Sequence, residues 1–178
     1  MKNKNHKSIA AALLITAVAL TSTARAEDDI QSEAQQAIAN FQAADSSLKQ
    51  YFDTSAGYAV FPSVGKGGFV VGGARGKGVL YEKGKAIGRT TLTQASIGAQ
   101  AGGQSFAEVI FFETPHALED FKSGQFEMSA DVSAVAAAEG AAKSAKYKNG
   151  VMVSALPKKG LMFQASVGGQ KFKYEPLR

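Results

Sequence analysis

The sequence predicts an α+β fold in which a strongly bent antiparallel β-sheet, or a barrel-like sheet, packs with an N-terminal helix and one or two short helices. Apolar residues recur at three- and four-residue steps between Glu27 and Phe52, as in an amphipathic helix. Between Tyr58 and Phe112 the period changes to two, which is typical of strands. Alternate positions in these strands are glycine or alanine, which indicates a sharply bent sheet or the close approach of another element.

The first 26 residues have the pattern of a secretory signal peptide. A basic start is followed by the apolar run Ile9 to Leu20, which is too short to span a bilayer, and Ala24-Arg25-Ala26 fits a cleavage site. A short N-terminal membrane anchor is the alternative. We therefore expect an exported protein that is located in the periplasm, is associated with the envelope or is secreted, with residues 27–178 as a single domain. The chain has no cysteine, so it has neither a disulfide nor a lipid-modified cysteine.

Charge is segregated along the expected mature chain. Residues 1–26 hold four basic and no acidic residues, so their removal lowers the formal net charge from +5 to +1. Residues 27–61 and 105–140 are acidic, whereas residues 62–104 and 141–178 are basic. Such blocks predict basic patches that attract an anionic partner, although solvated faces remain the alternative.

The expected helix Glu27 to Phe52 carries acidic residues in its first turns, where the helix dipole favours them. The apolar stripe of this helix is expected to pack on the sheet of the domain rather than on a membrane, because its polar face is acidic. In the segment Gly68 to Tyr81 the even positions are mostly glycine or alanine, so they form a face of the strand that is nearly bare of side chains. Arg75 and Lys77 lie on the opposite face.

The remaining elements follow from turn and cap signals. Glu82-Lys83-Gly84-Lys85 predicts a hairpin turn, and Thr114-Pro115 predicts the start of a short helix that Gly124 ends. The segment Met128 to Ala142 is ambiguous between helix and strand. Further strands are expected in three places: Val151 to Leu156, Leu161 to Val167, and Lys171 to Tyr174.

Glycines beside basic residues in SVGKGGFVVGGARGKG raise the possibility of a nucleotide-binding loop. A P-loop requires glycine, four residues and then Gly-Lys-Ser/Thr, but none of the Gly-Lys pairs has the required glycine or hydroxyl residue. The G-x-G-x-x-G pattern also fails, because Gly65 and Gly76 lead to Val70 and Tyr81 at the last position. These mismatches argue against nucleotide binding.

Catalytic and metal-binding patterns are also missing from the sequence. His116 is the single histidine after residue 26 and is expected at the surface, and no G-x-S-x-G occurs. The adjacent acidic pairs Asp28-Asp29 and Glu119-Asp120 point to different sides of their helices, so neither pair predicts a metal site. We therefore expect a binding or structural protein that is not an enzyme and has no cofactor and no metal.

Four segments together resemble the SYLF domain, a lipid-binding module that is also described as actin-binding in its yeast members. They are GYAVFPSVGKGGFVVGGARGKGVLY, ASIGAQAGGQSFAEVIFF, FKSGQFEMSADVSAVA and KKGLMFQASVGGQKFKYEP. The resemblance covers roughly Phe52 to Leu177, and the chain looks like the exported bacterial branch of the family.

The resemblance implies binding of anionic phospholipids and an α+β domain with a bent sheet. It also implies that Met128 to Ala138 is a strand. Many members carry a Trp-Ser-x-Pro run after the first hairpin, whereas this chain has Ala86 to Thr91 there without tryptophan, so any role of that motif is in doubt. Actin is not expected as a partner of an exported bacterial protein, and nucleic acid is not expected either.

The basic residues around the first strands are the best candidates for contact with lipid headgroups, because phosphate recognition needs convergent cations. These candidates are Lys66, Arg75, Lys77, Lys83, Lys85 and Arg89, and Lys158, Lys159, Lys171 and Lys173 come next. Ordinary solvated lysines at turns and edges are the alternative.

The first hypothesis for function is therefore a non-enzymatic binding protein of the bacterial envelope that associates with anionic phospholipids. A small outer-membrane β-barrel is the structural alternative, although the acidic helix and the few aromatic residues argue against it. An unrecognised hydrolase would need a site that the sequence does not show.

Overall fold

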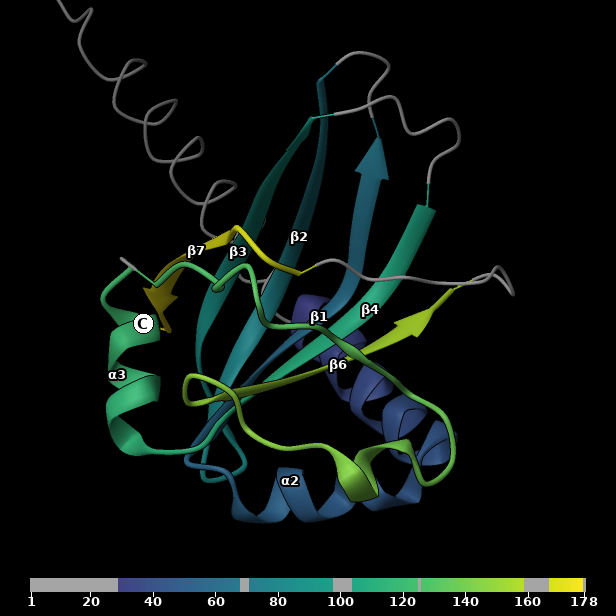
Figure 1. The fold of residues 1–178 in the computed structure, drawn as a ribbon. Coiled ribbons are helices and arrows are strands. Elements are labelled where there is room, and N and C mark those ends of the chain that lie inside the picture. Colours follow the sequence, from purple (N-terminus) through teal and green to yellow (C-terminus); the bar gives the residue numbers. More distant parts are fainter. Residues whose placement is uncertain (1–28, 68–70, 98–103, 125, 159–166, 178) are drawn as a thin grey trace, which may run out of the picture.

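The computed structural model describes residues 29–67, 71–97, 104–124, 126–158 and 167–177. Within these residues seven strands form one mixed sheet in the order β5-β6-β4-β1-β2-β3-β7 (Figure 1). The strands are β1 (Gly57–Gly67), β2 (Val71–Glu82), β3 (Lys85–Ile97), β4 (Gln104–Phe112), β5 (Val135–Ala136), β6 (Val151–Pro157) and β7 (Gln170–Pro176). Each pair of neighbours is antiparallel except β5 and β6, which are parallel.

The sheet is open but strongly curled, as the sequence predicts. The register of β1 shifts around Phe61 and Pro62 against both of its neighbours, and the pairing of β2 with β3 shifts after Leu80. Such bulges increase the local twist. The curl brings β7 over β4, although three strands separate them in the sheet: the Gln170 side-chain amide donates a hydrogen bond of 2.9 Å to the Glu108 carboxylate.

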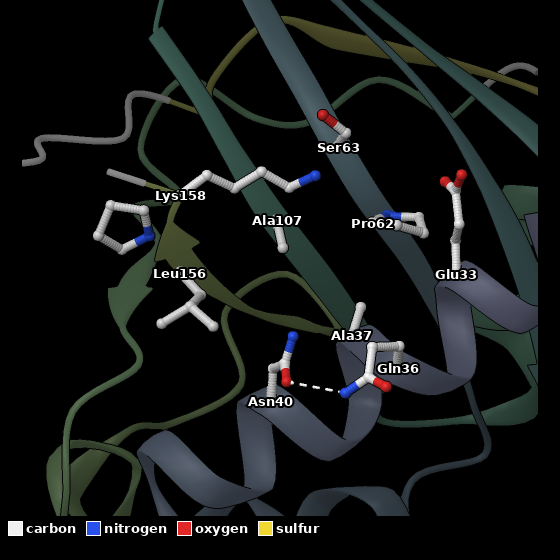
Figure 2. Close-up of a pocket in the computed structure, with 10 residues that line it drawn as sticks. Glu33, Gln36, Ala37, Asn40, Pro62, Ser63, Ala107, Leu156 and Lys158 are labelled. Atoms are coloured by element: carbon white, nitrogen blue, oxygen red, sulfur yellow. Dashed lines mark hydrogen bonds between the residues drawn. The ribbon is translucent and has the colours of Figure 1, made fainter. Parts of the chain in front are cut away.

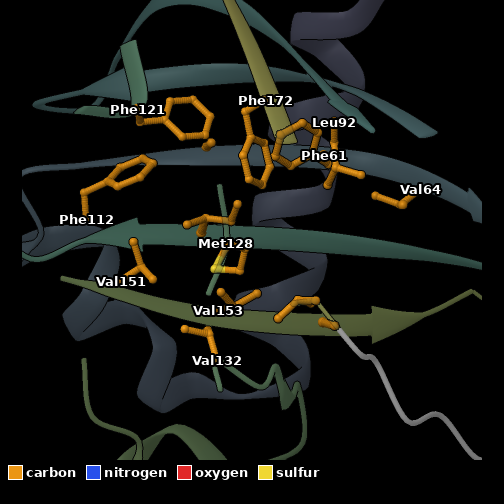
Figure 3. Packing of buried hydrophobic residues seen from close by; sticks show 14 of the residues in the cluster. Phe61, Val64, Leu92, Phe112, Phe121, Met128, Val132, Val151, Val153 and Phe172 are labelled. Atoms are coloured by element: carbon orange, nitrogen blue, oxygen red, sulfur yellow. The ribbon is translucent and has the colours of Figure 1, made fainter. Parts of the chain in front are cut away.

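Apolar side chains cover both faces of the sheet. The inner core lies on the concave face, where Phe61, Phe112, Phe121, Met128 and Phe172 converge (Figure 3). Helix α3 (Pro115–Lys122) and the segment 126–134 close this face. The helix-side core lies on the other face, under the N-terminal helix (residues 29–44) and α2 (Lys49–Thr54). The glycine-rich strands therefore form the middle layer of three.

Glycine in β2 makes room for bulky side chains of β1. A Cβ atom on Gly78 would lie 2.5 Å from the Val60 carbonyl oxygen and 2.7 Å from the Phe61 ring, and one on Gly76 would lie 3.0 Å from Val64. The prediction that another element approaches the bare face closely is confirmed here, because Phe61 packs directly on that face.

The prediction of a single helix over Glu27 to Phe52 is wrong in one respect, because the structure has a break at Asp45. Residues 29–44 are helical, but the helix stops at Asp45, and a 3₁₀ turn η1 (Ser46–Leu48) leads into α2. The backbone of Asp45 is extended, with φ −148° and ψ 101°, and its side chain caps the new turn. The apolar periodicity continues across the break, because Phe41, Leu48 and Tyr51 all enter the helix-side core.

The ambiguous segment after Met128 is mostly irregular. It contains only the two-residue strand β5 and the 3₁₀ turn η2 (Ala141–Ser144), so the strand over Met128 to Ala138 that the resemblance implies is wrong for most of its length. The segment still closes both cores, since Met128 and Val132 are buried on one face and Ala142 on the other.

The predicted turn and cap signals are confirmed. Lys83 and Gly84 have positive φ values of 51° and 75° in the β2–β3 turn. The Thr114 hydroxyl accepts a hydrogen bond from the Ala117 backbone N–H at the start of α3, and Gly124 with φ 74° follows its end. Strands β6 and β7 also appear as predicted, whereas the strand expected over Leu161 to Val167 lies almost entirely outside the described residues.

Among the described residues, no helix combines the length and the apolar content needed to cross a bilayer.

Candidate functional site

The antiparallel register gathers basic residues from three neighbouring strands on one face of the sheet. Arg75 on β2 pairs with Thr93, which pairs with Lys171 on β7. Lys77 pairs in the same way through Thr91 with Lys173. Directly paired residues share a face, so these rows form one surface. In the next row Val79 pairs with Arg89, which pairs with Glu175. We call Arg75, Lys77, Arg89, Lys171 and Lys173 the basic strip.

The cations of the basic strip are close enough to act together. Neighbouring strands lie about 4.8 Å apart, so Lys77 and Lys173 are separated by roughly 10 Å at the backbone. That separation is comparable to the screening length of about 8 Å at physiological salt, and flexible side chains reduce it. Arg75, Lys77, Lys171 and Lys173 are all exposed, so a ligand or a surface can reach the strip.

Two carboxylates partly neutralise the strip on the β7 side. Lys173 lies 2.7 Å from Glu175, and Lys171 lies 3.4 Å from Glu127. The hydrogen bond from Lys173 and its charge, with a smaller contribution from Arg89, lower the pKa of Glu175 below its ordinary value. Within the described part of the chain, Arg75 and Lys77 have no such carboxylate partner. The excess positive charge is therefore greatest on β2.

The structure separates the other predicted headgroup residues from this strip. Lys83 and Lys85 are exposed at the β2–β3 turn, six residues or about 20 Å along the strand from Lys77. The backbone of Lys66 pairs with Ala74 rather than with Arg75 or Lys77, and its side chain lies outside the described residues. Lys159 also lies outside them.

A second candidate site lies between the N-terminal helix and the same face of the sheet (Figure 2). It is a cleft of about 640 Å³, and Ala37, Ala107 and Leu156 contribute apolar side chains to its lining. Its rim carries polar side chains, and Lys158 extends from the end of β6 in the direction of β1. The full lining is Glu33, Gln36, Ala37, Asn40, Pro62, Ser63, Ala107, Leu156, Pro157 and Lys158.

A smaller hollow of about 400 Å³ adjoins this cleft, because Glu33 and Ser63 line both. It lies between the described start of the N-terminal helix and the β2 end of the basic strip. Its lining is Asp29, Ile30, Glu33, Ser63, Arg75, Gly76 and Lys77. We call the two hollows together the helix cleft.

The helix cleft owes its space to small residues that face one another. Ala37 and Ala107 are buried where the N-terminal helix and the sheet meet, with exposed fractions of only 5% each. Pro62 and Ser63, which also line the cleft, lie at the bulge of β1. The sequence signal for this site was weak, because alanine on a helix and on a strand also fits an ordinary packed interface.

The single histidine among the described residues lies at the surface. The His116 side chain is 85% exposed on α3, and its Nδ1 lies 3.4 Å from Asp120, which confirms the expected surface position. The described residues contain no group of three histidine or acidic side chains arranged to hold a metal ion.

Comparisons with known proteins agree with the resemblance seen in the sequence. Residues 93–175 match the family described as "Ysc84: Las17-binding protein actin regulator". The chain is also 32% identical over 129 residues to "Beta cell expansion factor A" from Aeromonas veronii, across 71% of this chain and 48% of that protein. The chain thus spans about half the length of this relative. Residues 93–175, which match the family, contain β4, α3, β5, β6 and all of β7 except its last residue. They therefore include Lys171 and Lys173 of the basic strip. The chain belongs, through this region, to the Ysc84 (SYLF) family.

Proposed function

We propose that the protein is a non-enzymatic component of the bacterial cell envelope that associates with anionic phospholipids through the basic strip. The observation that carries the proposal is the convergence of Arg75, Lys77, Arg89, Lys171 and Lys173 on one face of β2, β3 and β7. Convergent cations are what phosphate groups at a membrane surface require. The signal-peptide pattern of residues 1–26 supports export to the envelope.

The strip suits a surface better than a single deep headgroup pocket. The side chains of Arg75, Lys77, Lys171 and Lys173 are exposed along two parallel rows, so a broad anionic surface can contact several of them at once. Each basic residue held near an anionic membrane contributes about 1 kcal/mol to binding, and salt weakens this contribution. The strip therefore predicts moderate, salt-sensitive association.

Co-sedimentation of residues 27–178 with vesicles tests the proposal. Binding to vesicles that contain anionic phospholipid should fall as salt rises, and purely zwitterionic vesicles should be bound far less. Lys171→Gln combined with Lys173→Gln should weaken binding to anionic vesicles by about 30-fold, which corresponds to ~2 kcal/mol.

The matched control combines Lys143→Gln with Lys146→Gln, which removes the same charge from exposed lysines outside the strip. The control should retain nearly all of the binding. Equal losses in the two double variants would show that net charge, and not the strip, controls association. If the wild-type protein does not co-sediment with anionic vesicles at low salt, the proposal is refuted.

A further inference from the structure

Opposite walls of the helix cleft carry opposite charges. The helix wall has the carboxylates of Asp29 and Glu33, and the sheet wall has Arg75 and Lys77, with Lys158 at the far end. Among the described residues, none of these five side chains takes part in an ion pair. The two walls therefore face each other across open space instead of closing on each other.

This arrangement disfavours a ligand that carries only one sign of charge. A simple anion near Arg75 and Lys77 would also meet the two carboxylates, and a simple cation near Glu33 would meet the basic wall. A ligand that carries both signs can place each charge against the wall of opposite sign. The charge pattern of the smaller hollow thus points to a zwitterion.

The larger hollow adds an apolar requirement. Ala37, Pro62, Ala107 and Leu156 contribute apolar surface to it. The volumes of the two hollows, about 640 and 400 Å³, fall in the range of small-molecule sites, which is about 300 to 1,000 Å³. An amphiphile could therefore lie with its charged end in the smaller hollow and a chain in the larger one.

We propose that the helix cleft binds the zwitterionic phosphoethanolamine group of an individual amphiphile. The phosphate contacts Arg75 and Lys77, the ammonium contacts Asp29 and Glu33, and the attached chain runs past Ala107. Arg75 and Lys77 also belong to the basic strip, but the inference does not depend on vesicle binding. The inference predicts that the helix cleft binds a dissolved zwitterion more tightly than a simple anion. The basic strip alone would not show this preference.

Titration calorimetry with three dissolved probes tests this assignment. Glycerophosphoethanolamine carries both charges, glycerol phosphate lacks the ammonium, and a short-chain lysophosphatidylethanolamine below its micelle concentration adds a chain. We expect the lysolipid to bind most tightly and glycerol phosphate most weakly. Equal affinities for the two ethanolamine probes would overturn the placement of the chain, and the lack of binding by both would overturn the site.

Glu33→Gln removes one helix-wall charge from an exposed side chain, and Glu113→Gln is its control on an exposed loop residue. Glu33→Gln should weaken binding of glycerophosphoethanolamine by about fivefold and should not weaken binding of glycerol phosphate. Glu113→Gln should change neither affinity. Equal zwitterion affinities of the two variants would refute the role of the helix wall.

Ser63→Phe gives a second test, because Ser63 is exposed and lines both hollows. The ring should block the junction and abolish lysolipid binding, while salt-sensitive association with anionic vesicles should persist through Lys171 and Lys173. Unchanged lysolipid binding in a folded Ser63→Phe variant would overturn the site. This combination separates failure of the cleft from failure of the basic strip.

Discussion

Asp45 is a fully buried carboxylate that joins the N-terminal helix to a segment almost 100 residues away. Its Oδ1 accepts hydrogen bonds from the backbone N–H groups of Ser47 and Gly140, each at 3.0 Å, and its Oδ2 accepts one from Ala142 at 2.8 Å. The Ser47 hydroxyl donates a further bond. This one side chain therefore caps η1 and holds η2 against it.

Asp45→Ala should be strongly destabilising. It leaves the N–H groups of Gly140 and Ala142 without their partner, at a cost of about 1–3 kcal/mol each, and it removes a helix cap worth about 1 kcal/mol. Partial access of water reduces the sum, so we expect a loss of about 3–5 kcal/mol. Urea denaturation followed by circular dichroism measures this loss as a lower midpoint with an unchanged slope.

Ser47→Ala is the matched control, because it removes only the hydroxyl donor and keeps the three backbone bonds. It should cost about 1 kcal/mol or less. If Asp45→Ala costs no more than Ser47→Ala, the backbone hydrogen bonds to Asp45 do not hold the two segments together.

The same carboxylate predicts how stability depends on pH. Burial by itself raises the pKa of Asp45, but the hydrogen bonds from Ser47, Ala142 and Gly140 together outweigh burial and leave this pKa below its ordinary value of 3.8. The contribution of Asp45 is therefore complete above about pH 4 and is lost as the pH falls through the lowered pKa. Asp45→Ala should lack this part of the acid-induced loss of stability, which denaturation at several pH values would show.

Two further pairs of substitutions test the packing by urea denaturation. Gly78→Ala should lower the free energy of unfolding by about 1–3 kcal/mol, because the added Cβ atom would collide with Phe61. Gly65→Ala is its control and should cost much less, because a Cβ atom there meets nothing within 4 Å. Equal losses in the two variants would contradict the close packing at Gly78. Tyr81→Phe should be neutral or stabilising, because the buried Tyr81 hydroxyl has no hydrogen-bond partner within the described part of the chain. Tyr51→Phe should instead cost about 1 kcal/mol, because the Tyr51 hydroxyl donates a hydrogen bond of 2.7 Å to the Ala145 carbonyl group, with the Ala142 carbonyl oxygen also within reach at 3.2 Å. A larger loss for Tyr81→Phe than for Tyr51→Phe would contradict this assignment.

Local signals predicted most of the regular structure. The alternation between Tyr58 and Phe112, the Lys83-Gly84 turn and the Thr114 cap each depend on neighbouring residues, and each is found where it was expected. The break at Asp45 could not be predicted in this way, because the partners that stabilise it, Gly140 and Ala142, are distant in sequence.

In the candidate site, too, the features that depend on neighbouring residues could be predicted, whereas those that depend on distant residues could not. Local composition identifies the basic residues of β2, but it favours Lys83 and Lys85 over Lys171 and Lys173, which are far away in sequence. Only the pairing of β3 with β7 brings them beside Arg75 and Lys77. The alternation of Lys171, Phe172, Lys173 and Tyr174 did place both lysines on one face, but it could not show which strand they would join.

The glycines of β2 connect the packing of the domain to this surface. Gly76 and Gly78 accept the side chains of β1 on the concave face, while the residues between and beside them, Arg75 and Lys77, point to the opposite face. A larger residue at Gly78 would have to displace Phe61, and it would thereby disturb the strand that carries both cations. The glycines therefore act only indirectly on the phosphate contact that we propose: they fix the position of the strand, and Arg75 and Lys77 on its other face are the residues proposed to make the contact.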